Sequence, residues 1–154
     1  MTMDWHLEST EPLAFVDAVA AIILVDGERY LLQLRDNFPH IFFPGHWGLF
    51  GGAIEPGESE EQALRREVEE ETGIALGEAT RFCRIILQQD QLNGRASTRS
   101  YFESRITSAE LARAHLTEGA RMQSFTAREV LEMPRMKPND AFVLWQHVNR
   151  NRLW

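Results

Sequence analysis

The chain has 154 residues, of which 44% are hydrophobic and 25% charged. This balance is typical of one globular domain over residues 1–154, and it excludes a disordered, collagenous or coiled-coil chain. No apolar run approaches the roughly 18 residues that span a bilayer, and no secretory signal precedes the first strand. Cys83 is the single cysteine, which excludes an intrachain disulfide. We therefore expect a cytoplasmic protein without a membrane partner.

The negative charge is concentrated in one segment. The formal net charge is −7, and residues 55–71 hold eight glutamates against two arginines, so this segment carries −6 of it. No basic run occurs, which argues against sequence-specific nucleic-acid binding. Concentrated like charges are explained either by a solvated helix face or by a bound cation.

The first half of the chain predicts a hairpin, a loop and a helix. Residues 14–25 and 29–35 read as strands joined by an Asp26-Gly27 turn, and residues 36–46 read as a loop. Residues 47–50 predict a short strand that runs into Gly51-Gly52. Residues 59–72 predict a helix that ends at Gly73.

The second half predicts two strands, one further strand and two helices. Strands are expected at 79–90 and 97–106 around an Asn93-Gly94 turn, and at 121–125, whereas 108–119 is ambiguous. A capping box at Thr126 opens a short helix that stops before Pro134. The last helix is expected to bury an apolar face, which comprises Ala141, Leu144, Trp145 and Val148. Sheet and helices in mixed order indicate an α/β or α+β domain.

Three glutamates share one face of the acidic helix. Glu67, Glu70 and Glu71 are spaced i, i+3 and i+4, beside the apolar residues Leu64 and Val68. Like charges at this spacing destabilise a helix by a few tenths of a kcal/mol per pair, and a divalent cation reverses the effect. Mg²⁺ prefers oxygen ligands and is often shared with substrate phosphates.

These residues together resemble the Nudix hydrolase family. The family's G-x5-E-x7-R-E-U-x-E-E-x-G-U box, in which U is aliphatic, matches this chain at Gly52, Glu58, Arg66, Glu67, Val68, Glu70, Glu71, Gly73 and Ile74. The resemblance implies an α/β/α sandwich with a mixed sheet flanked by helices. It also implies a Mg²⁺-dependent hydrolase, with Mn²⁺ as a substitute, that cleaves a nucleoside diphosphate linked to another group X by attack of water on phosphorus.

The resemblance also implies roles for single residues. Glu67, Glu70, Glu71 and the carbonyl of Gly51 resemble the metal ligands. Arg66 resembles an arginine that braces Glu58, and Gly52 and Gly73 are structural positions of the box. The general base stays open among Glu67, Glu70 and the loop residue Glu118, with Glu103 as a lesser candidate. Phe50 stands where many members carry proline, which leaves the metal ligands intact.

The substrate is less defined than the reaction. Arg35 is a candidate for a phosphate and Trp47, Phe43 and Tyr101 for a base, against the alternatives of a surface ion pair and of core packing. Residues 75–91 contain neither proline nor tyrosine, which in this family disfavours ADP-ribose and diadenosine polyphosphates. A nucleoside triphosphate, intact or oxidised, or a nucleotide sugar remains. The alternative is a non-catalytic nucleotide-binding or regulatory module. Homodimers are frequent in the family.

Overall fold

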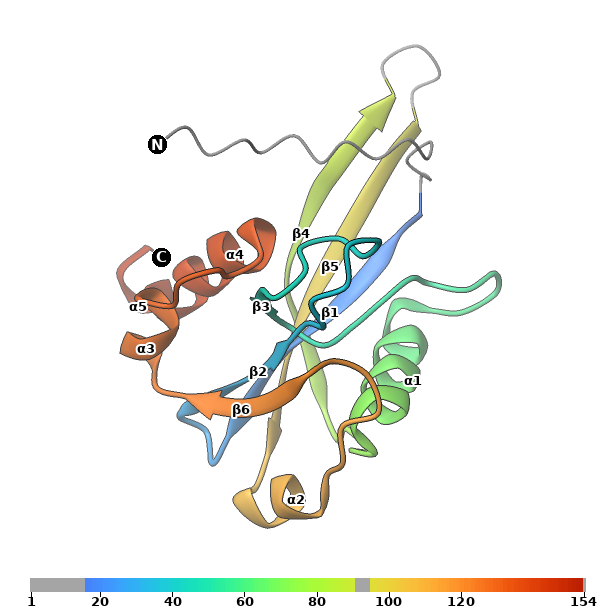
Figure 1. Cartoon of the computed structure of the whole chain (residues 1–154). Helices are drawn as coiled ribbons and strands as arrows, with labels where there is room; N and C mark the ends of the chain where they lie inside the picture. Colours follow the sequence, from blue (N-terminus) through green and yellow to red (C-terminus); the bar gives the residue numbers. More distant parts are fainter. Residues whose placement is uncertain (1–15, 91–94, 154) are drawn as a thin grey trace.

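Six strands form one mixed sheet in this computed structural model, which describes residues 16–90 and 95–153 (Figure 1). The strands are β1 (Ala18–Val25), β2 (Arg29–Leu34), β3 (Trp47–Gly48), β4 (Ala79–Asp90), β5 (Arg95–Ile106) and β6 (Arg121–Phe125). Their order is β3-β2-β1-β5-β4, and β6 pairs with β2 on its other edge. β1 and β5 run parallel, whereas the other pairs are antiparallel. The mixed sheet that the sequence predicts is confirmed.

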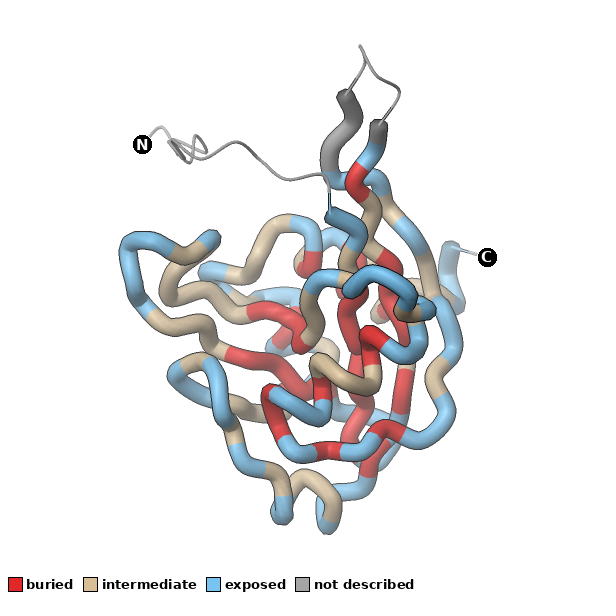
Figure 2. Tube along the Cα trace, turned by 90° about the vertical axis from the view of Figure 1, so that its right-hand side faces the viewer, coloured by how far each residue is buried: buried red, intermediate tan, exposed pale blue. Residues whose placement is uncertain are grey.

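Helices cover both faces of this sheet. They are α1 (Glu60–Thr72), α2 (Ser108–Arg113), α3 (Ala127–Leu131), α4 (Pro138–Val148) and α5 (Arg150–Leu153). In Figure 1, α1 lies on one side of the sheet, and α3 and α4 lie on the other. Alternate residues of β1 divide between two cores, because Val19 and Ala21 pack towards α1 while Ala20 and Ile22 pack towards α4. The buried central strands are red in Figure 2. The fold is the expected α/β/α sandwich.

Local signals in the sequence account for most element boundaries. Asp26 and Gly27 both have positive φ, at 50° and 77°, as a two-residue hairpin turn requires. The ambiguous segment 108–119 contains the short helix α2, which Thr107 caps. The Asn93-Gly94 turn and the first part of the strand expected from residue 14 lie outside the described residues. No helix among the described ranges is long and apolar enough to span a membrane.

The sheet divides next to its first hairpin. β1 and β2 pair at Leu24↔Tyr30 and Val25↔Arg29, and the segment 47–53 lies between them farther from the turn. Its first part pairs with β2, whereas Phe50 and Ala53 bridge to β1. This division brings Gly51 and Gly52 against the middle of the sheet.

The buried face of α4 corrects one expectation. Leu144 is buried as expected, but Trp145 of the expected face is 50% exposed, and the helix also buries Asp140, Val143 and His147. The buried face includes polar side chains because they find partners inside. His147 Nδ1 lies 2.9 Å from the Tyr30 hydroxyl, and His147 Nε2 lies 2.8 Å from Glu103 Oε2. A periodicity that counts only apolar residues therefore finds only part of the buried face here.

Candidate active site

The acidic helix α1 has well-defined ends. Ser59 and Gln62 form a reciprocal capping box, in which Ser59 Oγ accepts a hydrogen bond from the Gln62 amide at 3.2 Å. Gly73 adopts a left-handed conformation with φ 71°, and its amide donates to the Glu69 carbonyl at 2.8 Å. These caps fix which residues of α1 face the sheet.

Gly51 approaches β1 too closely for any side chain. A Cβ atom at this position would lie 2.1 Å from the Val19 carbonyl oxygen, and its φ of 144° is accessible essentially to glycine alone. The Phe50 and Gly52 carbonyls accept hydrogen bonds from the Ala21 and Val19 amides, both at 2.9 Å. Alternation along the segment turns the Gly51 backbone the other way, towards α1.

Glu71 and Glu67 of α1 flank the two glycines. Glu71 is 8% exposed, and its Oε2 accepts a hydrogen bond from the Gly51 amide at 3.2 Å. A Cβ atom on Gly52 would lie 2.5 Å from the Glu67 carboxylate, so this carboxylate lies directly against the Gly52 backbone. Burial is the largest cause that raises the pKa of Glu71 to about 8; the charges of Glu118 and Glu67 also raise it, whereas the hydrogen bond from Gly51 lowers it.

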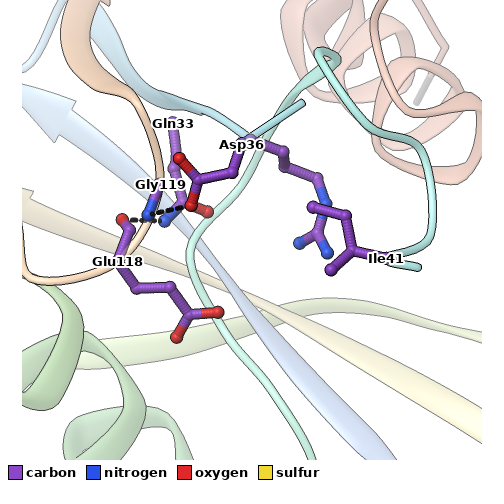
Figure 3. Close-up of a pocket in the computed structure, with 6 residues that line it drawn as sticks. Gln33, Asp36, Ile41, Glu118 and Gly119 are labelled. Atoms are coloured by element: carbon purple, nitrogen blue, oxygen red, sulfur yellow. Dashed lines mark hydrogen bonds between the residues drawn. The ribbon is translucent and has the colours of Figure 1, made fainter. Parts of the chain in front are cut away.

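A loop at the end of α1 positions Glu118 near Glu71. The Thr117 amide donates to the Glu71 carbonyl at 2.9 Å, and Thr117 Oγ1 donates to the Glu70 carbonyl. The loop thereby satisfies carbonyls that the last helical turn leaves free. Gln33 Nε2 donates to the Glu118 carbonyl at 2.7 Å, which Figure 3 shows together with the exposed Glu118 side chain. The expected loop glutamate therefore lies within electrostatic reach of Glu71.

Arg66 binds Glu58 in a bidentate pair. Its Nε and Nη2 donate to the two carboxylate oxygens of Glu58 at 2.7 and 2.9 Å, and Nη2 also donates to the Ala53 carbonyl. Arg66 Nη1 donates to Glu67 Oε1 at 2.8 Å. The hydrogen bond from Arg66 is the largest cause that holds the pKa of Glu58 at about 2. Arg66 thus ties the loop before α1 to Glu67.

Glu70 lies apart from this group. Its side chain is 63% exposed, and its Oε2 lies 3.4 Å from Arg66 Nη1. Glu103, the lesser candidate for the base, binds His147 on the α4 side of the sheet. Glu71 and Glu67 therefore lie against Gly51 and Gly52, and Glu118 lies within electrostatic reach of Glu71.

The donor set suits a hard divalent cation. Within residues 16–90 and 95–153, no three carboxylate, imidazole or thiolate side chains converge into a complete metal centre. Mg²⁺ typically takes only one or two protein carboxylates, keeps waters and shares substrate phosphates, so a partial set fits it. The buried Glu71 carboxylate, which two further carboxylates destabilise, is also the group that a cation would neutralise. Glu67, Glu71 and the Gly51 carbonyl could hold the ion.

The four substrate candidates lie in different surroundings. Arg35 lines a small hollow, together with Gln33, Asp36, Ile41, Glu118 and Gly119 (Figure 3), and its Nε donates to the Phe42 carbonyl at 2.8 Å. Tyr101 is 0% exposed, so the expectation that it stacks a base is wrong. Trp47 packs edge-on against Phe125 with 4.9 Å between the ring centres. Phe43 is half-buried in the loop beside His46.

The sequence alone does not indicate three charged residues that lie near the glycine segment, namely Asp140, Lys137 and Arg99. Asp140 is 1% exposed and accepts hydrogen bonds from the Leu49 amide at 3.0 Å and the Tyr101 hydroxyl at 3.1 Å. Its Oδ2 also lies 3.5 Å from Lys137 Nζ. Despite burial, the charges of Lys137 and Arg99 and both hydrogen bonds hold the pKa of Asp140 below its usual value. In the sequence, Asp140 precedes the apolar residues Val143 and Leu144 by one helical turn, and this spacing indicates that it lies on the buried face of α4.

Comparisons with known proteins show what this chain and its fold are similar to. A Salmonella agona protein named nucleoside triphosphatase NudI is 51% identical over 58 residues, which make up 38% of this chain and 40% of that protein. The chain thus matches about two fifths of the length of this curated relative. The MutT protein of Methanosarcina mazei has a TM-score of 0.71 and 23% identity, over 90% of this chain and 96% of that one.

A further solved structure with a similar fold is a single domain of a protein named NrtR. The NUDIX domain of Shewanella oneidensis NrtR, crystallised with ADP ribose, has a TM-score of 0.68 and 22% identity over 100% of both chains. At such identities, the two solved structures show the fold alone. The model of the family described as NUDIX domain matches residues 14–151 of this chain, which is most of the sequence. This chain therefore belongs to the NUDIX domain family.

Proposed function

We propose that this chain is a metal-dependent hydrolase that cleaves the diphosphate linkage of a nucleoside triphosphate by attack of water on phosphorus. One observation carries the proposal: Glu71 is buried against the Gly51 amide while the charges of Glu67 and Glu118 act on it. Burying a carboxylate among other carboxylates costs several kcal/mol unless a cation joins them. Such an arrangement is suited to binding a cation together with a polyphosphate.

The chain's own residues would divide the work among holding, bracing and proton transfer. Mg²⁺, when bound, would neutralise charge on the phosphate oxygens and lower the pKa of a bound water. Glu67 and Glu71 would hold the ion, and Arg66 would keep Glu67 in place through its second contact with Glu58. Glu118 is our candidate for the general base, because its exposed carboxylate comes from a loop fixed to the end of α1. Little other chemistry is required, since phosphoryl transfer depends mostly on positioning and electrostatics.

We infer the substrate class from the named relative and from the sequence of residues 75–91. A protein named nucleoside triphosphatase is 51% identical over 58 residues of this chain. Residues 75–91 lack the proline and tyrosine that the family associates with ADP-ribose and diadenosine polyphosphates. We therefore place nucleoside triphosphates first and nucleotide sugars second.

The test is a substrate screen with identified products. The full chain is incubated with intact and oxidised nucleoside triphosphates and with nucleotide sugars, in Mg²⁺, Mn²⁺ or EDTA. Glu71→Gln should abolish metal-dependent turnover and the rise in melting temperature that Mg²⁺ causes in the wild type. Glu118→Gln should lower kcat by about 10² to 10⁴-fold, as expected for loss of a general base. Full activity in Glu71→Gln would refute the proposal.

A matched control separates these roles from general loss of charge. Glu69 lies on the same helix, between the proposed ligands, and its side chain is exposed. Glu69→Gln should keep both turnover and the response to Mg²⁺. A wild type that binds nucleotides but turns over none of them would favour the regulatory module instead.

A further inference from the structure

Arg99 carries a buried nitrogen for which the described residues offer no hydrogen-bond partner. It lies on β5 opposite Ala18 of β1, and its guanidinium carbon is 5.8 Å from the centre of the Tyr101 ring. Among the described residues, no atom accepts a hydrogen bond from its buried Nε. Since at least about nine in ten buried polar groups are paired, this nitrogen indicates an acceptor that the described chain does not supply.

Two other cations share these surroundings. The Lys137 side chain is 15% exposed, and its Nζ lies 3.5 Å from Asp140 Oδ2. Burial lowers the pKa of Lys137, and the charges of Arg99 and Arg35 lower it further, against the opposing effect of Asp140. Asp140 is already engaged by Lys137, a backbone amide and a hydroxyl group. Within this group of four residues, the three cations Arg99, Lys137 and Arg35 outnumber the single carboxylate of Asp140.

This positive group adjoins the proposed hydrolytic site. Asp140 holds the amide of Leu49, which precedes Gly51 by two residues. The charge of Arg99 acts on Glu71 as well as on Asp140, so the guanidinium lies within electrostatic reach of both carboxylates. Arg35, which also acts on Lys137, lines the hollow that Glu118 borders. A ligand that reaches from Glu71 towards α4 would meet this positive group.

We propose that Arg99, assisted by Lys137, binds a phosphate group of the nucleotide on the α4 side of the Gly51 segment. This inference rests on the proposed function, because it assigns a residue that orients the same substrate. A guanidinium suits this role, since its donors can bind two phosphate oxygens at once and the orphaned Nε would gain an acceptor. The bound phosphate would also offset the repulsion between the positive charges of Lys137 and Arg35.

The test measures anion binding without metal, and thus without turnover. Calorimetry in EDTA compares inorganic pyrophosphate and inorganic phosphate on the full chain and on variants whose folding is checked by circular dichroism. Arg99→Gln should weaken pyrophosphate binding about tenfold or more, as expected for loss of a charge-assisted hydrogen bond. Arg99→Lys should weaken it less, and it decides the question if Arg99→Gln does not fold. Arg105→Gln, on the same strand with a 67% exposed side chain, is the matched control and should bind like the wild type.

Kinetics then separate this inference from the proposed function. Arg99→Gln should raise KM for the nucleotide more than it lowers kcat, whereas a purely structural role would leave the affinity for pyrophosphate unchanged. Equal affinity in wild type and Arg99→Gln, or no binding of pyrophosphate by the wild type, overturns the inference even if the wild type hydrolyses nucleotides. Binding through Arg99 in a wild type that hydrolyses none of the substrates overturns the proposed function and supports the anion site.

Discussion

Substituting Gly51 by alanine should destabilise the fold, both through a steric clash with β1 and through backbone strain at a positive φ. The added Cβ would lie 2.1 Å from the Val19 carbonyl oxygen and 2.8 Å from the Ala20 Cα. Both atoms belong to the backbone of the central strand β1, so no side-chain movement can relieve the overlap. The segment would have to leave β1 and lose the hydrogen bonds from Val19 and Ala21, which together contribute about 1–3 kcal/mol. Strain at the positive φ adds about 1–3 kcal/mol.

Gly57 provides the matched control for this experiment. It also has a positive φ, of 87°, but no atom lies within 4 Å of the place that a Cβ would take, so Gly57→Ala adds backbone strain alone. Urea denaturation in EDTA should therefore show that Gly51→Ala destabilises the fold by about 1–3 kcal/mol more than Gly57→Ala does. Gly51→Ala should also lose metal-dependent turnover. Equal destabilisation by the two substitutions would contradict the proposed contact between Gly51 and β1.

Three further substitutions test single charges. Arg66 holds the pKa of Glu58 near 2, so the ionised Glu58 stabilises the fold above its ordinary pKa of 4.5, and this contribution is lost as pH falls through 2. Arg66→Gln should therefore reduce the loss of stability between pH 4.5 and pH 2 in acid unfolding. The pKa of Glu71 is raised to about 8, mainly by burial, so the protonated carboxyl group stabilises the fold fully below pH 4.5, and in EDTA this stability should be lost as pH rises through 8. Urea denaturation of Glu71→Gln at the same pH values should show no such loss. Asp140→Asn leaves Lys137 without its carboxylate and should cost about 3 kcal/mol in urea denaturation; a loss below about 1 kcal/mol would contradict a buried ion pair.

The parts of the structure that the sequence predicts are those set by local chemistry. The Asp26-Gly27 turn places two residues that tolerate positive φ between apolar strands, so the hairpin follows. Ser59 and Gly73 define α1 through interactions within a few residues of each helix end. The spacing of Glu67 and Glu71 then determines that both carboxylates lie on one helix face. No distant residue is needed for any of these predictions.

The parts that could not be predicted depend on partners that are far apart in sequence. Tyr101 is apolar in a periodicity count, yet its hydroxyl donates to Asp140, 39 residues away, and this contact keeps the ring in the core. His147 is buried because Tyr30, 117 residues away, offers a hydroxyl group. Such contacts bring polar residues of α4 into the face that the helix buries. A single sequence does not reveal them, because the burial of a polar residue depends on its partner.

The division of the sheet explains how charges of opposite sign come close together in one small domain. Side chains normally fill both faces of a central strand, and they would hold α1 and α4 apart across the sheet. At Gly51 and Gly52 no side chains are present, so the Glu71 carboxylate reaches the backbone from the α1 side, while Asp140 holds Leu49 from the α4 side. The charge of Arg99 on the second face consequently acts on Glu71 on the first. A metal–polyphosphate complex needs anionic ligands for the ion and cationic ligands for the phosphates, and two side-chain-free residues in mid-sheet would allow both sets to act on the substrate that we propose.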